Sequence, residues 1–335
     1  MVNSLTPART SRTDPDERCG WSGTPPATWC TDATPPAPPG PAEPSDGADA
    51  SREARAALCL HVESRDHDFD DCVLDTIGNG VLFHRQAGDA DAIDARDVSQ
   101  GQVADCFVFA CLAALSQTPD GRDLLRRAIV ENKGADGNVT GWTVTLHQRE
   151  THFTGATFRD VQVTVDSAFV VGHGAARRAS ADKGSPQEVW PLVLEKALAK
   201  YLGGYETLNR GGDPAAVMAL LVGREATSVS LDWPDRWVQG YGARELASDL
   251  AAGKFVVLIS RADLAAVPDA PVHPGASAPA HGLFADHAYF VIGVEEHDGR
   301  QLVRVGNPWG FGQPEAVPCA ELARWFSHVS VASLR

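Results

Sequence analysis

The 335-residue chain has no run of about 18 apolar residues, the length that a membrane-spanning helix requires. Its N-terminal segment also lacks the apolar stretch of a secretory signal peptide. These two absences predict a protein with no membrane-spanning segment and no membrane partner. The predicted location is the cytoplasm, and export by another route stays open.

Paired cysteine spacings are absent as well. The chain has seven cysteines, an odd number, and no C-x-x-C motif; Cys106 and Cys111 lie five positions apart. This pattern argues against a disulfide framework and a zinc site, and it suits a reducing compartment. Whether Cys19 and Cys30 pair with each other is left open.

Positive charge is scarce. Lysine and arginine together number 29, against 44 aspartates and glutamates, which gives a formal net charge of −15. Such a balance argues against nucleic acid and anionic membrane surfaces as the main partners. Only five of the 29 positive residues are lysines, which is typical of a GC-rich bacterial coding bias and indicates source rather than function.

Proline is unevenly distributed. Ten of the 22 prolines lie within residues 1–55, where large aliphatic side chains are few. A segment of this composition cannot bury enough apolar surface to fold, so 1–55 is predicted to be a disordered tail, either an inert leader or a pro-segment. The Gly211-Gly212 pair predicts a hinge, which divides the remainder into a lobe over 56–212 and a lobe over 213–335.

Hydrophobic patterns predict a mixture of helices and strands. The predicted helices cover 122–130, 188–201, 214–221 and 243–252, and the predicted strands cover 141–147, 158–165, 255–259, 288–294 and 301–305. Residues 268–279 are rich in Pro, Ala and Gly and are predicted to form a loop. A turn at Asp298-Gly299 joins the last two strands, so they should pair as an antiparallel hairpin.

The chain is organised around the segment from Asp97 to Leu115, where a polar loop ends at Asp105-Cys106 and an apolar run of helical length begins. A thiol at a helix N-terminus lies at the positive end of the helix dipole, which favours the thiolate. Gln100 lies six residues upstream, where the loop can fold its amide back beside the sulfur. Acyl transfer requires such an activated sulfur and a fixed donor for the oxyanion. The alternative is a buried cysteine in a core helix.

A second candidate cluster lies at the ends of the predicted hairpin. His287 precedes its first strand, and Asn307 follows its second strand within the sequence Gly-Asn-Pro-Trp-Gly. Because antiparallel pairing brings these positions to one end, the two side chains should lie within reach of each other. The His would accept the proton of Cys106, and the Asn amide would fix the orientation and tautomer of the ring. Trp309 would shield that hydrogen bond from water.

Together these motifs resemble the catalytic core of the calpain-type cysteine proteases. The shared patterns are Gln-Gly-x-x-x-Asp-Cys, His-Ala-Tyr and Asn-Pro-Trp-Gly. Residues 190–212 add support, because Trp-Pro-Leu-Val-Leu-Glu-Lys-Ala-Leu-Ala-Lys, Gly-Tyr-Glu-Thr-Leu and Gly-Gly are similar to the W-x-x-L-L-E-K-A-Y-A-K…G-x-Y-E-A-L-x-G-G segment of that family. The resemblance covers about residues 80–310.

The resemblance implies an α+β fold of the papain-like, two-lobed type, with a helical lobe carrying the cysteine and an antiparallel β lobe carrying His and Asn. By this resemblance, Cys106 is the nucleophile and His287 is the general base and acid. Asn307 orients the imidazole, and Gln100 supplies the oxyanion-hole side chain. The implied reaction is hydrolysis of protein or peptide substrates through an acyl-enzyme. His287 would activate the deacylating water, and the chemistry requires no cofactor.

Three positions depart from the family pattern. Phe107 stands where the family usually has Trp after the Cys, an aromatic exchange that we expect to be tolerated. Asp286 replaces the Gly that normally precedes the His, which is expected to alter the substrate cleft or add a charge near His287. Gly306 replaces the Arg that normally precedes the Asn.

Calcium is the one further ligand that the resemblance raises, because each lobe of the core binds one calcium in calcium-regulated members. In the nucleophile lobe the acidic ligands match Asp97 and Glu188, the candidate ligands of a regulatory calcium. Hard carboxylate oxygens suit calcium, but two acids are few. The alternative is a plain loop acid and a helix N-terminal acid. In the other lobe the acidic positions fall on Gln313 and Ala320, which predicts no calcium there.

The leading hypothesis is a calpain-like cysteine endopeptidase. A papain-type peptidase shares the order of Gln, Cys, His and Asn, but the Asn-Pro-Trp and Glu-Lys-Ala sequences argue against it. A catalytically silent calpain-like module that binds peptides is disfavoured by the presence of all four catalytic residue types. Transglutaminase-like acyl transfer typically uses Asp in place of the Asn. The oligomeric state does not follow from the sequence.

Overall fold

The computed structural model describes residues 73–77, 80–85, 89–101, 103–153, 155–171, 187–231, 241–264, 266–272 and 276–335. All of the described elements belong to one unit by their backbone contacts, Asp46–Arg335. The predicted tail over 1–55, with Cys19 and Cys30, lies outside the described residues. None of the helices in the described ranges combines the length and the apolar character needed to cross a bilayer.

The described helices and 3-10 turns are η1 (Ala95–Asp97), α3 (Cys106–Ser116), α4 (Pro119–Ala128), α5 (Trp190–Leu202), α6 (Tyr205–Asn209), α7 (Pro214–Val222), α8 (Ala243–Ala251), η2 (Ala280–Gly282), η3 (Cys319–Glu321) and α9 (Leu322–Trp325). Thr118 and Asp213 cap α4 and α7 with side-chain oxygens that accept backbone N–H groups. A proline follows each cap, where its missing N–H is not needed. The four helices predicted from the sequence correspond to α4, α5, α7 and α8.

The described strands are β1 (Val73–Thr76), β2 (Gly80–Val81), β3 (Ile129–Lys133), β4 (Val139–His152), β5 (Gly155–Asp166), β6 (Ala168–Val171), β7 (Gln187–Glu188), β8 (Ala226–Ser230), β9 (Phe255–Ser260), β10 (Ala266–Val272), β11 (Ala276–Pro279), β12 (Ala288–His297), β13 (Arg300–Gly306), β14 (Val317–Pro318) and β15 (Phe326–Ala332). They form a six-stranded sheet in the order β14-β13-β12-β9-β15-β8, a three-stranded sheet β3-β4-β5, and the pairs β1–β6, β2–β7 and β10–β11. The mixture confirms the predicted α+β fold class.

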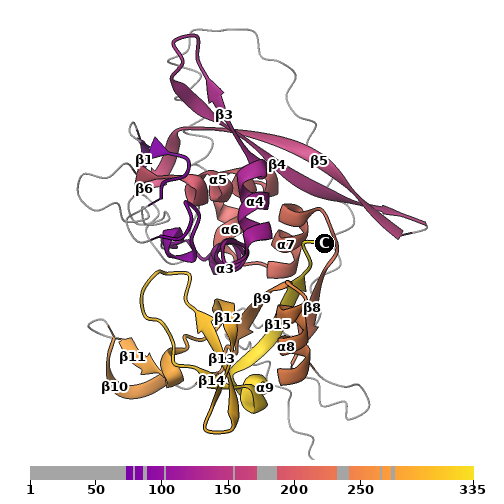
Figure 1. Ribbon diagram of the computed structural model, residues 1–335. Helices are drawn as coiled ribbons and strands as arrows, with labels where there is room; N and C mark the ends of the chain where they lie inside the picture. Colours follow the sequence, from indigo (N-terminus) through magenta and orange to yellow (C-terminus); the bar gives the residue numbers. More distant parts are fainter. Residues whose placement is uncertain are drawn as a thin grey trace, which may run out of the picture. The chain divides into compact units, whose positions relative to one another are not determined.

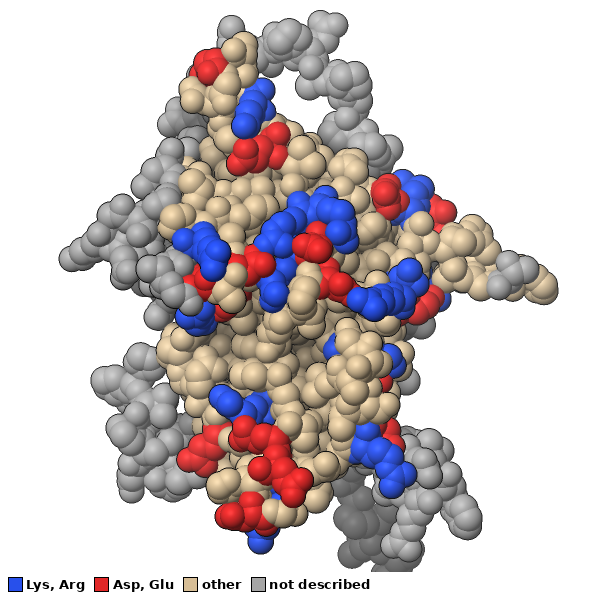
Figure 2. Space-filling model, viewed as in Figure 1, with Lys and Arg blue, Asp and Glu red and all other residues tan. Residues whose placement is uncertain are grey.

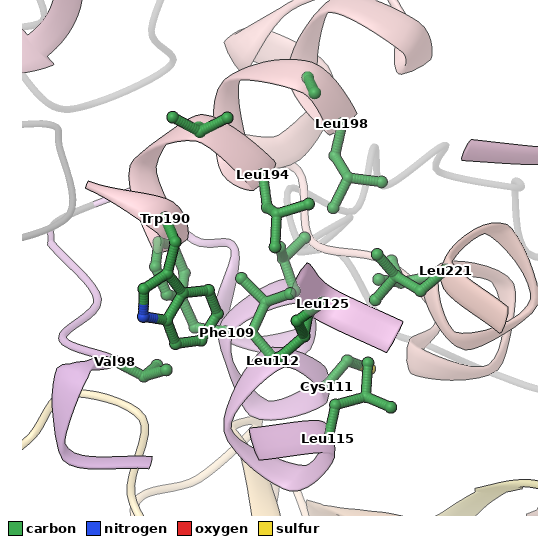
Figure 3. Close-up of a cluster of buried hydrophobic side chains, with 14 of the residues drawn as sticks. Val98, Phe109, Cys111, Leu112, Leu115, Leu125, Trp190, Leu194, Leu198 and Leu221 are labelled. Carbon is green, nitrogen blue, oxygen red and sulfur yellow. The ribbon is translucent and has the colours of Figure 1, made fainter. Parts of the chain in front are cut away.

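Helix α3 is the central element of the core. Its residues from 107 to 116 are all buried, and a helix that is apolar on every side belongs in a core. It contacts α4, α5 and α7 as well as strands β9 and β12 (Figure 1). Figure 3 shows Phe109, Leu112 and Leu115 of α3 gathered with Trp190 and Leu194 of α5. The cysteine that begins α3 is therefore anchored by a buried helix.

The middle of the six-stranded sheet is buried on both faces. Residues of its middle strands alternate between two hydrophobic clusters, with Phe255, Val257, Ala288 and Phe290 on the α3 side and Val256, Leu258, Tyr289 and Val291 on the other. The second cluster also contains Leu246 of α8 and Leu322 of α9. A strand buried on both faces has an unbroken apolar sequence, which is why β9 was predictable.

Strands β12 and β13 form the predicted antiparallel hairpin. Residue pairs run from His297 opposite Arg300 to Phe290 opposite Gly306. Asp298 and Gly299 make the turn with φ of 49° and 71°, as a two-residue hairpin loop with left-handed backbone requires. The pairing ends at Gly306, so the chain segments that carry His287 and Asn307 leave the sheet at one edge.

One predicted element is wrong. Residues 268–279 were expected to form a loop, but their backbone forms most of the hairpin β10–β11, with Ala266 opposite Pro279 and Val272 opposite Ala276. The pairing is irregular between Val267 and Val272. Proline cannot donate a ladder hydrogen bond, and the prolines of β10 fall in that irregular stretch. Their presence obscured the strand pattern in the sequence.

The three-stranded sheet extends the two predicted strands at 141–147 and 158–165 into a long hairpin of β4 and β5. It projects from the helices in Figure 1, and Phe153 at its tip is fully exposed. The base of the hairpin is buried through Trp142, Val144 and Leu146.

The acidic stretch that leads to the nucleophile is neutralised locally. Asp91 pairs with Arg122 at 3.1 Å and also with Arg126, both on α4, and Arg96 pairs with Asp89 at 2.6 Å. Figure 2 shows acidic and basic side chains interspersed on the visible face. The Asp91 pairs tie the loop before Cys106 to α4, and the Arg96 pair lies within the loop.

Candidate active site

Cys106 is the first residue of α3, as the sequence predicted, and it is half-buried. The Asp105 carbonyl accepts the N–H groups of Val108 and Phe109 at 2.8 and 3.2 Å. The Cys106 N–H lies in the first turn, where N–H groups have no partner inside the helix. The backbone N–H of Ala288 in β12 lies near enough to the sulfur of Cys106 to lower the pKa of the thiol.

The thiol of Cys106 is held in its neutral form. Burial raises the pKa of the thiol to about 12. The negative charges of Asp105 and Asp286 add to this rise in pKa, while the Ala288 N–H opposes it. The helix N-terminus by itself favours the thiolate, as the sequence suggested, but removal of the sulfur from water outweighs it.

His287 and Asn307 are brought together at the sheet edge. His287 Nε2 and Asn307 Oδ1 lie 3.0 Å apart, and the backbone N–H of Trp309 donates to the same oxygen at 3.0 Å. Since an N–H points at this atom, it is the amide oxygen, and His287 Nε2 must donate to it. Nδ1 then carries the lone pair, which is the tautomer that a base needs.

The imidazole is enclosed by aromatic rings. The ring of Trp309 lies 4.5 Å from it and the ring of Tyr289 4.9 Å, the latter edge-on. His287 is 5% exposed. Burial lowers its pKa to about 4, and the hydrogen bond to Asn307 opposes that change. The contact between the Trp309 ring and the imidazole agrees with the prediction that Trp309 shields the His287–Asn307 hydrogen bond from water.

Sequence inspection missed Ser260, which holds the backbone of His287. The Ser260 hydroxyl accepts the His287 N–H at 2.9 Å and lies 2.6 Å from the Phe284 carbonyl, to which it donates. The Ser260 N–H donates to the His287 carbonyl at 2.9 Å. Ser260 ends β9, and no local sequence signal marks a serine there as part of a site.

Gln100 lies at the meeting of two loops. Its side chain is buried, and Nε2 donates one hydrogen bond to the Val103 carbonyl at 2.7 Å. Its backbone N–H donates to the Pro308 carbonyl at 2.8 Å, and Ser99 Oγ donates to the Trp309 carbonyl at 3.3 Å. These bonds hold the Gln100 loop against the loop that follows β13. Its role as oxyanion donor stays a prediction.

Two buried carboxyl groups lie behind the nucleophile. Asp105 and Glu195 are 0% and 1% exposed, and the charge of Asp105 raises the pKa of Glu195, so the two carboxyl groups lie close together. Two ionised carboxylates would repel each other at this distance from water, which favours a proton on the pair. Burial raises the pKa of Asp105 to about 7 and the pKa of Glu195 well above its ordinary value. The pair therefore holds a proton near neutral pH.

The candidate calcium ligands Asp97 and Glu188 also lie together, at 3% and 2% exposure. Asp97 Oδ2 accepts the N–H of Asp94 at 2.6 Å, and Glu188 Oε1 accepts the N–H of His84 at 2.9 Å. Glu188 Oε2 is buried without a hydrogen-bond partner. Burial, followed by the neighbouring carboxylate, raises the pKa of Glu188 to about 9. In the described residues no set of three or more His, Cys, Asp or Glu side chains is gathered around a metal position.

Each departure from the family pattern has a local setting. Phe107 is buried against Gly212, where a Cβ would lie 2.6 Å from its ring. The Phe290 ring covers Gly306. Asp286 is exposed and has a left-handed φ of 51°, a conformation that favours glycine.

In this α+β fold a cysteine begins a buried helix beside the edge of an antiparallel sheet. This arrangement is the fold of a papain-like thiol protease core. A model of the calpain family of cysteine proteases matches residues 83–328. The chain belongs to this calpain family.

Individual relatives agree with this assignment. The chain is 27% identical over 223 residues to calpain-13 of Rattus norvegicus, a match that covers 64% of this chain and 29% of that protein. It is 27% identical over 219 residues to the calpain-2 catalytic subunit of Homo sapiens, covering 64% and 28%. A calpain-type cysteine protease of Oryza sativa subsp. japonica is 24% identical over 221 residues, covering 65% and 9%. The matched part thus spans less than a third of each relative.

Proposed function

We propose that this chain is a cysteine endopeptidase that hydrolyses peptide bonds in proteins through Cys106, His287 and Asn307. The observation that carries the proposal is the His287–Asn307 hydrogen bond of 3.0 Å, placed beside the strand whose Ala288 N–H approaches the sulfur of Cys106. The bond fixes the imidazole as a base, and the buried helix fixes the nucleophile.

The chemistry proceeds by acyl transfer. The sulfur of Cys106 attacks the substrate carbonyl carbon while His287 Nδ1 accepts the thiol proton. Gln100 Nε2 and the Cys106 N–H face the oxygen on which negative charge develops. His287 then gives its proton to the leaving nitrogen as the C–N bond breaks, which leaves a thioester. A water attacks the thioester, His287 accepts a water proton, and the C–S bond breaks with return of that proton to sulfur.

The test is cleavage of casein by the full chain, beside Cys106→Ala and Cys111→Ala. Cys111 lies on the same helix but is fully buried, so its variant is a matched control. We expect cleavage by the wild type and by Cys111→Ala, and none by Cys106→Ala. Absence of cleavage by the wild type, with and without calcium, would contradict the proposal in favour of a silent peptide-binding module. Incorporation of an added amine in place of hydrolysis would indicate a transglutaminase-like reaction.

We propose in addition that Asp97 and Glu188 would hold a regulatory calcium. The proposal is supported by two buried carboxyl groups that lie together, one of which leaves its Glu188 Oε2 atom without a hydrogen-bond donor. A bound cation would offset their mutual repulsion and stiffen the loop that leads to Cys106. Calcium is then expected to raise the thermal unfolding temperature of the wild type. A Glu188→Gln variant that keeps the full calcium-dependent rise would contradict this assignment.

A further inference from the structure

The loop that follows β13 is closed around Asn307 by the side chain of Gln313. Beyond Gly306 the strand pairing ends, so the Asn307 backbone needs partners outside the sheet. Gln313 Oε1 accepts the Asn307 N–H at 2.8 Å, and Gln313 Nε2 donates to the Asn307 carbonyl at 3.2 Å. The carbonyl has a second donor, the Gly310 N–H at 3.2 Å. Among the described hydrogen bonds, Gln313 is the partner of the N–H.

The amide of Gln313 fits this place because it offers an acceptor and a donor side by side. The backbone N–H and carbonyl of Asn307 are the complementary donor and acceptor. The carboxamide oxygen of Gln313 must therefore face the N–H, and its nitrogen must face the carbonyl. Asn307 itself is 1% exposed, whereas Gln313 is exposed. The contact that closes the loop therefore joins an exposed side chain to the backbone of a buried residue.

The side chain of Asn307 has its own three contacts. Its Oδ1 accepts from His287 Nε2 and from the Trp309 N–H, both at 3.0 Å, and its Nδ2 donates to the Gly312 carbonyl at 3.3 Å. Gly312 precedes Gln313, so the segment that carries Gln313 also orients the amide plane. A shift of the Asn307 backbone would move Oδ1 away from the imidazole.

We propose that Gln313 is a positioning residue for catalysis, which holds the Asn307 backbone and through it sets the ring of His287. The inference rests on the proposed function, since it assigns Asn307 to the same reaction. Ser260 performs the equivalent task for the His287 backbone, so the base and its orienting residue are each held by one polar side chain.

The first experiment compares Gln313→Met, Gln313→Glu and Gln301→Met in the full chain, with kcat and KM measured on a fluorogenic peptide. Methionine keeps the length but makes neither bond, whereas glutamate keeps the acceptor for the Asn307 N–H. Gln301 is an exposed residue of β13 and serves as the control. We expect kcat to fall about tenfold or more in Gln313→Met with KM within about twofold, to recover largely in Gln313→Glu, and to stay unchanged in Gln301→Met. A kcat within twofold of wild type for Gln313→Met would overturn the proposal.

The second experiment asks whether Gln313 acts through Asn307. If it does, Gln313→Met should cause no further loss in an Asn307→Ala background, because the group that it positions is gone. An undiminished tenfold loss in that background would overturn the proposal.

A third measurement does not depend on proteolysis. The rate at which iodoacetamide alkylates Cys106, followed on its peptide by mass spectrometry across pH, should change in Gln313→Met in the same direction as in Asn307→Ala. If the wild type cleaves nothing but this agreement is found, the proposed function fails and the positioning role stands. If the wild type cleaves casein and the Gln313→Met alkylation profile equals that of the wild type, the positioning role fails alone.

Discussion

The nucleophile and the base of this site are held in place by different physical means. Behind Cys106 lie the fully buried carboxyl groups of Asp105 and Glu195, whose pKa values are both raised by burial. Around His287 and Asn307 the supporting groups are neutral, a hydroxyl and a carboxamide that bond to backbone. The first arrangement depends on pH and on both partners being present, whereas the second depends on geometry alone.

The largest expected effect tests the base side. In His287→Ala no group can accept the thiol proton, so kcat/KM should fall on the order of 10³-fold. His297→Ala, at an exposed position beside the hairpin turn, should keep wild-type activity. Steady-state kinetics on the same fluorogenic peptide measure both, and a loss of less than about tenfold in His287→Ala would remove the imidazole from the mechanism.

On the nucleophile side, substitutions in the Asp105–Glu195 pair are expected to lower the stability of the fold and not only the activity. Glu195→Ala would leave a cavity and remove the polar neighbour of the buried Asp105 carboxyl group, which costs about 2–5 kcal/mol of unfolding free energy. Glu195→Gln keeps a donor for that carboxylate and should cost about 1 kcal/mol. Urea unfolding at neutral pH distinguishes the two. Equal stabilities for the two variants would mean that the carboxyl pair is not a connected unit.

Stability should also depend on pH through this pair. The pKa of Asp105 is raised from 3.8 to about 7 on folding, so between these values the folded state holds more protons than the unfolded state. The unfolding free energy contributed by Asp105 is therefore full below about pH 4 and is lost as the pH rises through about 7.

Asp105→Asn removes this titration, so it serves as the reference. We expect the wild type to lose on the order of a few kcal/mol relative to this variant between pH 4 and 8. The opposite contribution of His287, whose lowered pKa makes stability rise with pH, is present in both proteins and cancels in the difference. Parallel stability curves for the two proteins would contradict the raised pKa of Asp105.

The smallest expected effect concerns Asp286. Asp286→Gly removes a left-handed residue with φ of 51° and should stabilise the fold by about 1 kcal/mol. It also removes a negative charge that raises the pKa of the Cys106 thiol, so iodoacetamide should alkylate Cys106 faster at a given pH. Asp298→Gly relieves the same backbone conformation, with φ of 49°, at the distant hairpin turn. It should stabilise the fold without changing the alkylation rate, and equal alkylation in both variants would contradict the electrostatic effect.

The parts of the site that the sequence predicted are those encoded by local patterns. An apolar run placed Cys106 at the start of a helix, and Asp298-Gly299 between two alternating segments placed His287 and Asn307 at one sheet edge. Turn chemistry and periodicity act over a few residues, so they can be recognised without the fold.

Other supporting groups were not predictable because they meet across long stretches of chain. Ser260 reaches the His287 backbone from the end of a neighbouring strand, and Glu195 approaches Asp105 from a different helix. Only tertiary packing creates these contacts. Packing also decides the ionisation of Cys106: the helix N-terminus predicts a thiolate, but burial of the sulfur, which the sequence does not show, favours the thiol.

The contact between Gly306 and Phe290 has a consequence for transferring this active site to other proteins. A Cβ at position 306 would lie 2.1 Å from the Phe290 ring, and that ring is only 6% exposed, so it has little room to move away. Any side chain introduced at position 306 therefore requires a smaller residue at position 290. A chimaera that brings the Arg found before the Asn in related proteases into this chain must replace Phe290 before or together with Gly306.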